Sequence, residues 1–284
     1  NDGFIIKLNS KGDIVFSKVI GGKGYDSVDQ IHVDNQQDLY LFGNIIDLNG
    51  GTYLFWMKFN KNLDLIWTEQ IGIPNLIKIS AVIPMSISNF VIAANYFNLS
   101  YMKTNVWLLK IDSDGEKIWS NEEGQQNDID INDIASDNAG NFYLTGSVKK
   151  QTALNKDFYF AKYDSNGTLI WDKNFGSDAN DELTAIDFDG ISSFYLTGFT
   201  EGNYKDSVNR GKKDFVYMKY TDDGTEESSY QFGTEEDDEL KSIIFRNSSE
   251  LFVAGYTDGE YSNFNNYGGS DLILFKFGEN QILE

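Results

Sequence analysis

Carboxylates are the reactive side chains that this sequence carries in the largest number. Among its 284 residues, 44 aspartates and glutamates stand against 23 lysines and arginines, which gives a formal net charge of −21. Two carboxyl groups about 5 to 10 Å apart can hydrolyse a glycosidic bond, and several oxygen ligands together can bind Ca²⁺. The sequence therefore leaves two carboxylate chemistries open, and the positions of the acidic residues in the fold decide between them.

Other catalytic chemistries are excluded by residues that are absent or rare. The chain has no cysteine, so thiolate catalysis, cysteine-ligated zinc and iron–sulfur clusters are ruled out. Its one histidine, His32, falls in an expected strand over residues 30–34. We expect it to be a packed or channel-lining residue rather than a member of a Ser–His–Asp triad. Two arginines, Arg210 and Arg246, are too few for the arginine triad of sialidases.

One short segment resembles the start of a calcium-binding loop. It is Asp112-Ser113-Asp114-Gly115, with Glu123 at the twelfth position. Because Trp119 and the surrounding strand pattern do not fit a helix–loop–helix site, we expect this segment to be a plain hairpin turn. The acidic loops described below are the better place for Ca²⁺. It is the only ion for which the sequence leaves a site open. We expect no organic cofactor.

The elements that must position these residues come from an internal repeat. A lysine ends an apolar segment in each repeat, at intervals of 51, 52, 52, 57 and 57 residues: Lys7, Lys58, Lys110, Lys162, Lys219 and Lys276. Nine residues after each of the first four stands an aromatic residue: Phe16, Trp67, Trp119 and Trp171. The repeats begin near residues 4, 54, 106, 157, 214 and 271. Several anchors in one register indicate a repeat architecture.

Each repeat contains four short apolar segments with the composition of strands. In the fourth repeat they cover residues 158–163, 169–175, 183–188 and 194–199, and Asp164-Ser165-Asn166-Gly167 forms a tight turn between the first two. No segment has a convincing helical period. We therefore predict an all-β fold, a β-propeller of four-stranded antiparallel blades, with about five and a half repeats present.

The repeat resembles the SBBP repeat, a bacterial β-propeller repeat. The resemblance is carried by residues 157–171, by the spacing of Gly176 and Asp181, and by residues 194–198. The pairs Gly21 with Asp26 and Gly233 with Asp238 repeat that spacing. The second repeat departs most, because Leu63, Pro74 and Ala94 replace recurring residues, so we expect its blade to be distorted. The resemblance implies a propeller fold in a bacterial protein and no shared active site.

Related propellers imply an order of strands from the axis outward. The segment with Ala185 and Ile186 would be innermost, and the tryptophan-bearing segment outermost, so the chain holds five inner strand pairs and six outer pairs. Unequal numbers do not close a ring. We therefore expect one propeller domain over residues 1–284, a fragment of a six- or seven-bladed parent. An open edge strand could pair with another chain, so we expect self-association.

The strand order also predicts a binding face. It gathers two kinds of loop at one end of the blades, one acidic and one long and variable, and function concentrates on such loops. The predicted binding residues are Asp26, Asp181, Asp238, Tyr96, Tyr101, Tyr204, Tyr261 and Tyr267. The tyrosines could stack on sugar rings or anchor a protein. Ordinary loop packing is the alternative for these tyrosines.

Together these features predict a non-catalytic scaffold that mediates protein or glycan contacts, or spaces other domains, at a bacterial cell surface or in a secreted protein. The alternative is a carbohydrate-active hydrolase that uses two loop carboxylates near the central channel. Nucleic acid is not an expected partner, because the acidic chain would repel it. No run of 18 or more apolar residues occurs, so we expect no membrane insertion.

Overall fold

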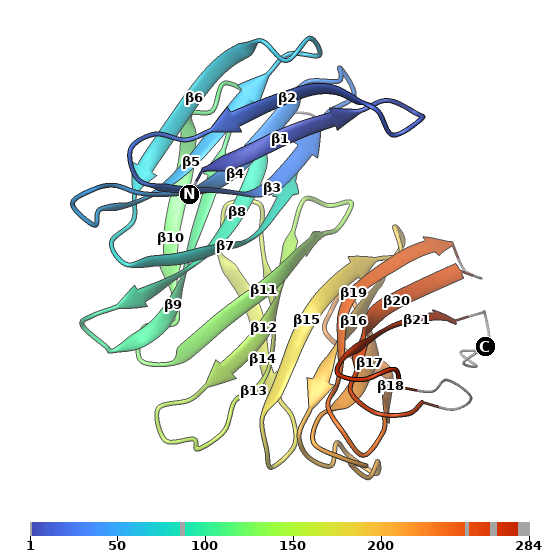
Figure 1. Cartoon of the computed structure of the whole chain (residues 1–284). Helices are drawn as coiled ribbons and strands as arrows, with labels where there is room; N and C mark the ends of the chain where they lie inside the picture. The colour runs from blue at the N-terminus through green and yellow to red at the C-terminus, as the bar shows by residue number, and fades with distance from the viewer. Residues whose placement is uncertain (1, 86–88, 248–249, 262–265, 278–284) are drawn as a thin grey trace. The chain divides into compact units, whose positions relative to one another are not determined.

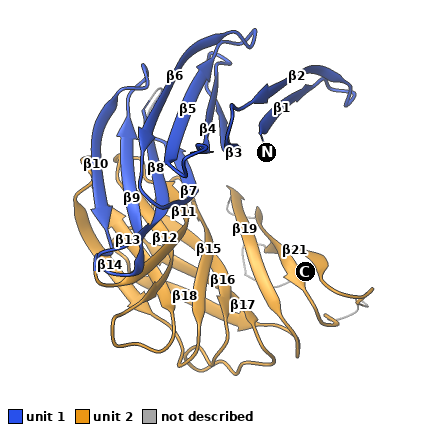
Figure 2. Ribbon diagram, turned by 60° about the vertical axis from the view of Figure 1, so that its left-hand side comes forward, with its two compact units in different colours: residues 1–125 blue, residues 126–284 orange. Residues whose placement is uncertain are grey.

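The computed structural model describes residues 2–85, 89–247, 250–261 and 266–277, and the regular secondary structure of this part consists of strands (Figure 1). The chain divides into two compact units, residues 1–125 and residues 126–284, which are coloured separately in Figure 2. Each unit is built from antiparallel sheets, and the two are described in turn.

Unit 1 contains one sheet of two strands and two sheets of four. The two-stranded sheet pairs β1 (Gly3–Leu8) with β2 (Ile14–Ile20). The second sheet has the order β3 (Tyr25–Val33), β4 (Leu39–Ile46), β5 (Thr52–Phe59) and β6 (Leu65–Gly72). The third has the order β7 (Leu76–Pro84), β8 (Phe90–Asn98), β9 (Lys103–Ile111) and β10 (Lys117–Glu123).

Unit 2 continues the same pattern. Its first sheet has the order β11 (Asp128–Ser136), β12 (Phe142–Lys149), β13 (Asp157–Tyr163) and β14 (Leu169–Phe175). The second has β15 (Asp181–Phe188), β16 (Ser193–Thr200), β17 (Asp214–Thr221) and β18 (Glu226–Phe232). The third has β19 (Asp238–Asn247), β20 (Glu250–Thr257) and β21 (Asp271–Phe277).

These sheets are the predicted blades, and the predicted order of strands within them is confirmed. The inner pairs are β3–β4, β7–β8, β11–β12, β15–β16 and β19–β20. In unit 2 the first strand β15 contacts both β11 and β19, as expected for innermost strands of neighbouring blades. The partner that was expected for β21 falls on residues 278–284, which lie outside the described residues. The prediction of a single domain stays a prediction, because each unit is described by itself.

The recurring residues of the sequence occupy matching places in the blades. Lys162 lies directly opposite Trp171 on the neighbouring strand, and Lys58 lies opposite Trp67 in the same way. Gly198 faces a β-bulge between Leu183 and Ala185, where a β-carbon on the glycine would lie 2.0 Å from the carbonyl oxygen of Glu182. No side chain fits there, which explains why glycine recurs at this point.

The expected distortion of the second repeat is visible in its register. Ala94 takes the place of the recurring glycine in the second strand of a blade, which is Gly198 in β16. The β7–β8 pair has two register shifts, one between Leu76 and Lys78 and one between Ile79 and Ala81. The other inner pair of unit 1 has a single shift, between Val28 and Gln30. The shift opposite Ala94 corresponds to the bulge opposite Gly198, and the additional shift lies opposite Tyr96 and Asn95. The β19–β20 pair, which keeps Gly255, also has two shifts, so the additional shift does not depend on the loss of glycine.

The segment that resembles the start of a calcium-binding loop, residues 112–115, forms a hairpin turn in the structure. Asp112 accepts hydrogen bonds from the backbone N–H groups of Asp114 (2.9 Å) and Glu116 (3.0 Å), and Gly115 has a φ of 84°. Asp164 does the same for Asn166 and Thr168 in the turn before β14. The prediction that residues 112–115 form a plain hairpin turn is confirmed.

Candidate functional site

Two kinds of loop lie side by side at one end of the sheets of unit 2: loops that connect blades, and loops that join the second and third strands of one blade. We call this surface the loop face; it comprises residues 150–156, 176–180, 201–213, 233–237 and the described part of 258–270. Backbone N–H groups link successive loops: Asp181 donates to Lys156 O, Glu201 to Asn180 O, Asp238 to Lys213 O and Asp258 to Asp237 O, at 2.8 to 2.9 Å. The two kinds of loop therefore share one face in unit 2, as the strand order predicted.

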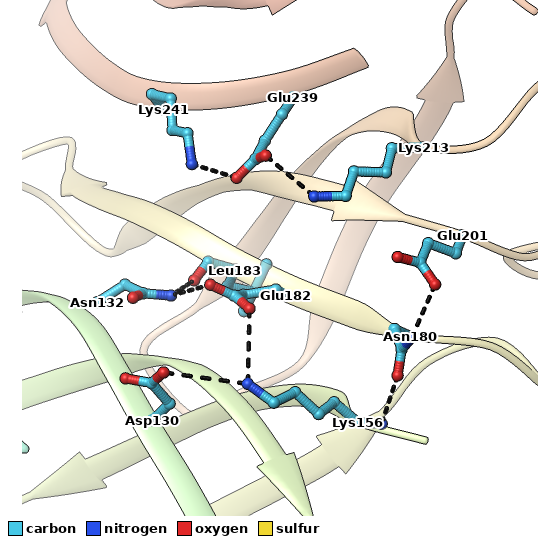
Figure 3. Close-up of polar contacts among 10 residues, drawn as sticks. All are labelled: Asp130, Asn132, Lys156, Asn180, Glu182, Leu183, Glu201, Lys213, Glu239 and Lys241. Carbon is cyan, nitrogen blue, oxygen red and sulfur yellow. Dashed lines mark hydrogen bonds and ion pairs between the residues drawn. The ribbon is translucent and has the colours of Figure 1, made fainter. Parts of the chain in front are cut away.

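A set of charged and polar side chains lies where the innermost strands meet these loops. We call it the inner-strand charge cluster; it comprises Asp130, Asn132, Lys156, Glu182, Lys213, Glu239 and Lys241, most of them linked by contacts in Figure 3. Three of its carboxylates stand at equivalent places on β11, β15 and β19. Lys156 and Lys213 are also equivalent, each one residue before a third strand.

One lysine joins two blades in this cluster. Lys156 Nζ lies 4.0 Å from Asp130 Oδ2 and 3.9 Å from Glu182 Oε2 (Figure 3). Asn132 stands at the bulge of β11 and donates to Glu182 Oε1 and to Leu183 O, each at 2.9 Å. These bonds tie β11 to β15, so the geometry of this part of the cluster is set by the packing of neighbouring blades.

Glu239 is the buried centre of the second half of the cluster. It forms ion pairs with Lys213 (3.3 Å) and Lys241, and Tyr256 Oη donates to it at 2.7 Å. Burial opposes ionisation of Glu239, but hydrogen bonds from Lys241 and Tyr256 and the charges of both lysines outweigh it and hold its pKa below the usual range. Glu239 is therefore an ionised carboxylate whose oxygens are already bonded.

The three aspartates predicted for the binding face lie beneath the loops rather than on them. Asp181 is fully buried and accepts hydrogen bonds from Ser177 N (2.6 Å), Ser177 Oγ (3.0 Å) and Thr200 Oγ1. Asp238 is also fully buried and accepts from Thr234 N. Asp26, in unit 1, is buried and accepts from Gly22 N at 2.7 Å. All three hold the loop that precedes their strand.

Burial shifts the acidity of two of these carboxyl groups. Loss of solvation raises the pKa of Asp181 to about 6, although hydrogen bonds from Thr200 and Ser177 work in the opposite direction. Loss of solvation likewise raises the pKa of Asp238, and the negative charge of nearby Asp214 adds to that rise. The raised pKa values of Asp181 and Asp238 therefore follow from their burial beneath the loops.

The predicted tyrosines fall into two groups. Tyr101 and Tyr267 are exposed, with 43% and 89% of their surface accessible. Tyr96 and Tyr204 are buried, and their hydroxyls donate to Glu122 (2.8 Å) and Glu226 (3.1 Å) respectively. Tyr261 packs against Phe215 and Phe275. Tyr96 and Tyr101 belong to unit 1 and the other three to unit 2, so the structure brings together only part of the predicted set.

Sequence reasoning missed two exposed apolar residues of the loop face. Leu154 and Val208 lie on two of its loops with 87% and 73% of their surface exposed, whereas Tyr267, on a third loop, was predicted. The charge cluster was also missed, although a signal was present. Glu182 and Glu239 each follow the recurring aspartate, and Lys156 and Lys213 each precede an aspartate that opens a third strand.

Unit 1 contains a cavity that the sequence did not predict. It has a volume of about 510 Å³ and lies between the β1–β2 pair and the β3–β6 sheet. Its wall is mostly apolar, with Ile20, Ile45, Phe55 and Met57, and the loops of residues 21–24 and 47–49 also line it. At the other end of β3, the His32 ring packs against Phe90 at 5.3 Å, and burial lowers the pKa of His32. His32 is therefore a packed residue, as predicted.

The described residues contain no group of three or more histidines, aspartates or glutamates placed to hold a metal ion. They also contain no helix long and apolar enough to cross a membrane. The innermost carboxylates of the acidic loops, such as Asp181 and Asp238, accept backbone hydrogen bonds.

Known proteins match this chain in structure but not in sequence. No family model matches, and no curated protein matches. A solved structure described as the β-propeller domain of the Trilobed protease from Pyrococcus furiosus, with an open velcro topology, is similar with a TM-score of 0.52 at 10% identity. The match covers 93% of this chain and 71% of that one. This likeness, together with the blades, establishes the β-propeller fold.

Two further solved structures are similar at lower scores. The Hadza microbial sialidase Hz136 has a TM-score of 0.49 at 10% identity, with 88% of this chain and 56% of that chain covered. CoXyl43, a β-xylosidase/α-arabinofuranosidase from a compost microbial metagenome, has a TM-score of 0.46 at 11% identity, with 92% and 94% covered. Membership of the SBBP repeat family stays a prediction.

Proposed function

We propose that this protein is a non-catalytic propeller scaffold that contacts a protein or a glycan through its loop face, as a bacterial cell-surface or secreted protein with SBBP-type repeats. The observation that carries the proposal is the contrast between neighbouring loops of the loop face. Buried Asp181 and Asp238 hold the loops of residues 176–180 and 233–237. Leu154, Val208 and Tyr267 are exposed on the adjacent loops of residues 150–156, 201–213 and 266–270. Exposed apolar side chains on a rigid, polar frame favour recognition.

The state of the carboxylates supports binding over glycoside hydrolysis. A hydrolase needs an accessible carboxylic acid with a raised pKa to protonate the leaving group. Asp181 and Asp133 have pKa values raised to about 6, chiefly by burial, and their oxygens accept backbone hydrogen bonds inside the fold. Glu239 has a lowered pKa and two lysine partners. These carboxylates fit structural roles better than acid catalysis.

A glycan array tests the proposal when it is run with Ca²⁺ and again with a chelator. We expect selective, saturable binding that is lost in the triple variant Leu154→Ser, Val208→Ser, Tyr267→Ser. The matched control is Ile191→Ser, which removes an equally exposed apolar side chain (82%) from the turn between β15 and β16. A blank array in both conditions would leave protein contact or spacing as the function.

A second assay addresses catalysis directly. Purified protein is incubated with a panel of plant and bacterial polysaccharides, and released reducing sugar is measured. The proposal expects no release above a heat-denatured control. Release that disappears in a single carboxylate variant with wild-type stability would contradict a non-catalytic scaffold.

A further inference from the structure

The cavity of unit 1 lies at a contact between two sheets. Ile20 of β2 lines it from one sheet, and Phe55 and Met57 of β5 line it from the other, together with Asn49 of the loop between β4 and β5. Its volume is about 510 Å³. Protein interiors leave few voids larger than a water molecule, so a space of this size between packed sheets needs an explanation.

At one contact in unit 2, an aromatic ring fills the corresponding place. Counting from the recurring lysines makes Phe232 equivalent to Ile20, and makes Phe275 equivalent to Met57. The ring of Tyr261 lies 6.4 Å from the ring of Phe232 and 5.4 Å from that of Phe275. A tyrosine of the chain itself therefore occupies the position that corresponds to the cavity.

A second contact in unit 2 repeats this arrangement. Phe175 is equivalent to Ile20, and Met218 is equivalent to Met57. The ring of Tyr204 lies 6.3 Å from the ring of Phe175, and Tyr204 and Met218 belong to one buried cluster. Two contacts of unit 2 thus place a phenol ring between the outermost strand of one sheet and the third strand of the next.

Asn49 stands where these tyrosines would be expected. Tyr204 and Tyr261 each follow the recurring glycine in the second strand of their sheet by six residues, and in the β3–β6 sheet that place is Asn49. Its backbone N–H donates to Asp47 Oδ1 at 2.8 Å, which fixes a turn at this point. Because asparagine is shorter than tyrosine and has no ring, the space beneath the loop stays open.

Gly3 accounts for a second missing ring. Each tyrosine of unit 2 also packs against a phenylalanine on the third strand of the preceding sheet. The rings of Tyr204 and Phe158 are 5.7 Å apart. Those of Tyr261 and Phe215 are 6.3 Å apart. The lysine register places Gly3 at the phenylalanine position in β1, so two aromatic side chains correspond to a glycine and an asparagine at the cavity.

The neighbouring contact in unit 1 shows which elements form such a cavity. A smaller one, of about 380 Å³, lies at the equivalent place between the β3–β6 and β7–β10 sheets. There Ile73 replaces Gly22, and Trp107 replaces Phe55. None of the described residues that line it belongs to the inner strands β3 and β4 of the preceding sheet. The cavity therefore needs only an outermost strand, the loop that follows it and the next sheet.

The wall of the larger cavity favours an uncharged ring. Aromatic and thioether side chains such as Phe55 and Met57 make favourable contacts with a flat ring. They offer no partner to a charged group, which would lose its hydration beside them. Lys23, Asp26 and Asp47 also line the cavity and are of both signs, so they select neither an anion nor a cation.

We propose that this cavity of unit 1 binds a small, uncharged aromatic molecule, whose ring takes the place that Tyr204 and Tyr261 fill in unit 2. The ring packs between Ile20 and Met57, as the tyrosines pack between the equivalent residues. A volume of about 510 Å³ is within the range of ligand pockets. The proposal concerns unit 1 alone and does not depend on what the loop face binds.

NMR of the methyl groups of the four methionines tests the proposal, with indole as the probe. Met57 lines the cavity, whereas Met218 holds the equivalent, fully buried position in unit 2 and serves as an internal control. We expect the ring current of indole to shift the Met57 signal, with a dissociation constant on the order of 0.1 to 1 mM. The Met218 signal should stay in place, and Met57→Leu assigns the shifting signal.

A pair of similarly shaped probes tests the preference for an uncharged molecule. Benzamide and benzoate have nearly the same size, but benzoate carries a charge that the apolar wall would desolvate. We expect benzamide to shift the Met57 signal and benzoate to bind at least about tenfold more weakly. The same labelled protein serves for both titrations.

Two variants fill the cavity and a third leaves it open. Gly22→Ile copies Ile73 of the neighbouring contact, and a β-carbon at Gly22 meets no atom within 4 Å. Asn49→Tyr copies the tyrosines of unit 2 and keeps the backbone N–H that bonds Asp47. Each should weaken indole binding at least about tenfold. Gly22→Ala adds a single methyl group and should bind like the wild type, and circular dichroism confirms that every variant is folded.

Four results would overturn the proposal. One is a Met57 signal that does not shift, or that shifts linearly with indole and never saturates. Another is a Met218 signal that moves as much as that of Met57. The third is tight indole binding that survives in both folded filling variants, which would place the site elsewhere. The fourth is equal binding of benzamide and benzoate.

Discussion

The second and fourth repeats build the same four strands from different residues. In the fourth, Gly167 takes the left-handed conformation of the turn between β13 and β14, whereas Leu63 takes it between β5 and β6, with φ values of 78° and 67°. Asp181 lies opposite Thr200 at the start of β15, whereas Leu76 lies opposite Tyr96 at the start of β7.

The second repeat replaces each missing anchor with a local substitute. Thr52 Oγ1 donates to Ile73 O and accepts a hydrogen bond from Leu76 N, which holds the loop before β7 without a buried carboxylate. The bulge opposite Ala94 is kept, and an additional register shift lies opposite Tyr96 and Asn95. The comparison teaches that the recurring residues serve backbone geometry, and that a repeat can lose them when nearby contacts take over. It also argues that their recurrence says nothing about a ligand.

The largest expected difference between the repeats concerns the strand glycine. Gly198→Ala would place a β-carbon 2.0 Å from Glu182 O, so the backbone must move, and we expect the free energy of unfolding to fall by about 4 kcal/mol or more. The reverse change, Ala94→Gly, should cost about 1 kcal/mol. Urea denaturation of both variants measures the two values. Equal losses would show that the bulge does not exclude a side chain.

The next effect is the pH dependence that Asp181 confers. Its pKa of about 6 in the folded protein exceeds the ordinary value of 3.8, so folding favours the protonated form. Its contribution to stability is fully present below about pH 4 and is lost as the pH rises to about 6, with a magnitude of about 3 kcal/mol.

A matched pair of proteins isolates this contribution. The difference in unfolding free energy between the wild type and Asp181→Asn is measured from pH 4 to pH 7, so that other titrating groups cancel. We expect the wild type to lose stability relative to the variant across this window. A constant difference would mean that Asp181 titrates normally in the folded protein.

A double-mutant cycle sharpens the contrast between polar and apolar anchors. Asp181→Leu removes the acceptor of Ser177 N and Thr200 Oγ1, and we expect a loss of about 2 kcal/mol. Adding Thr200→Val should recover about half of that loss, because the third repeat already places Ile129 opposite Val148 at this position. Additive losses in urea denaturation would contradict an interaction between Asp181 and Thr200.

The smallest expected effect is a gain. Leu63→Gly relieves a left-handed backbone conformation that leucine rarely adopts, at the cost of a more flexible unfolded chain. We expect the free energy of unfolding to rise by about 0.5 kcal/mol. Gly167→Leu is the matched reverse change and should destabilise by about 1 kcal/mol. A loss of stability in Leu63→Gly would indicate that the leucine side chain contributes packing that outweighs the strain.

The sequence predicted the blades well because their anchors repeat. The lysine register, the strand glycine and the hairpin turns each reflect local geometry, and local geometry is readable from spacing. The fold and the grouping of the loops followed from these anchors.

The candidate site was less predictable. Asp181 and Asp238 stand in an acidic loop sequence, and only the tertiary structure shows that they turn inward while Leu154 and Val208 turn outward. The charge cluster depends on contacts between neighbouring blades, such as that of Lys156 with Glu182, and spacing within one repeat does not reveal such contacts.

The central claim is that buried aspartates hold loops of the loop face in place. Amide hydrogen exchange in the double variant Asp181→Leu, Thr200→Val tests it most directly, since this variant should stay folded without the anchor. We predict that exchange at Ser177 N–H accelerates at least about tenfold, while the amides of β15 and the equivalent Thr234 N–H keep their wild-type rates. Unchanged exchange at Ser177 would contradict the claim.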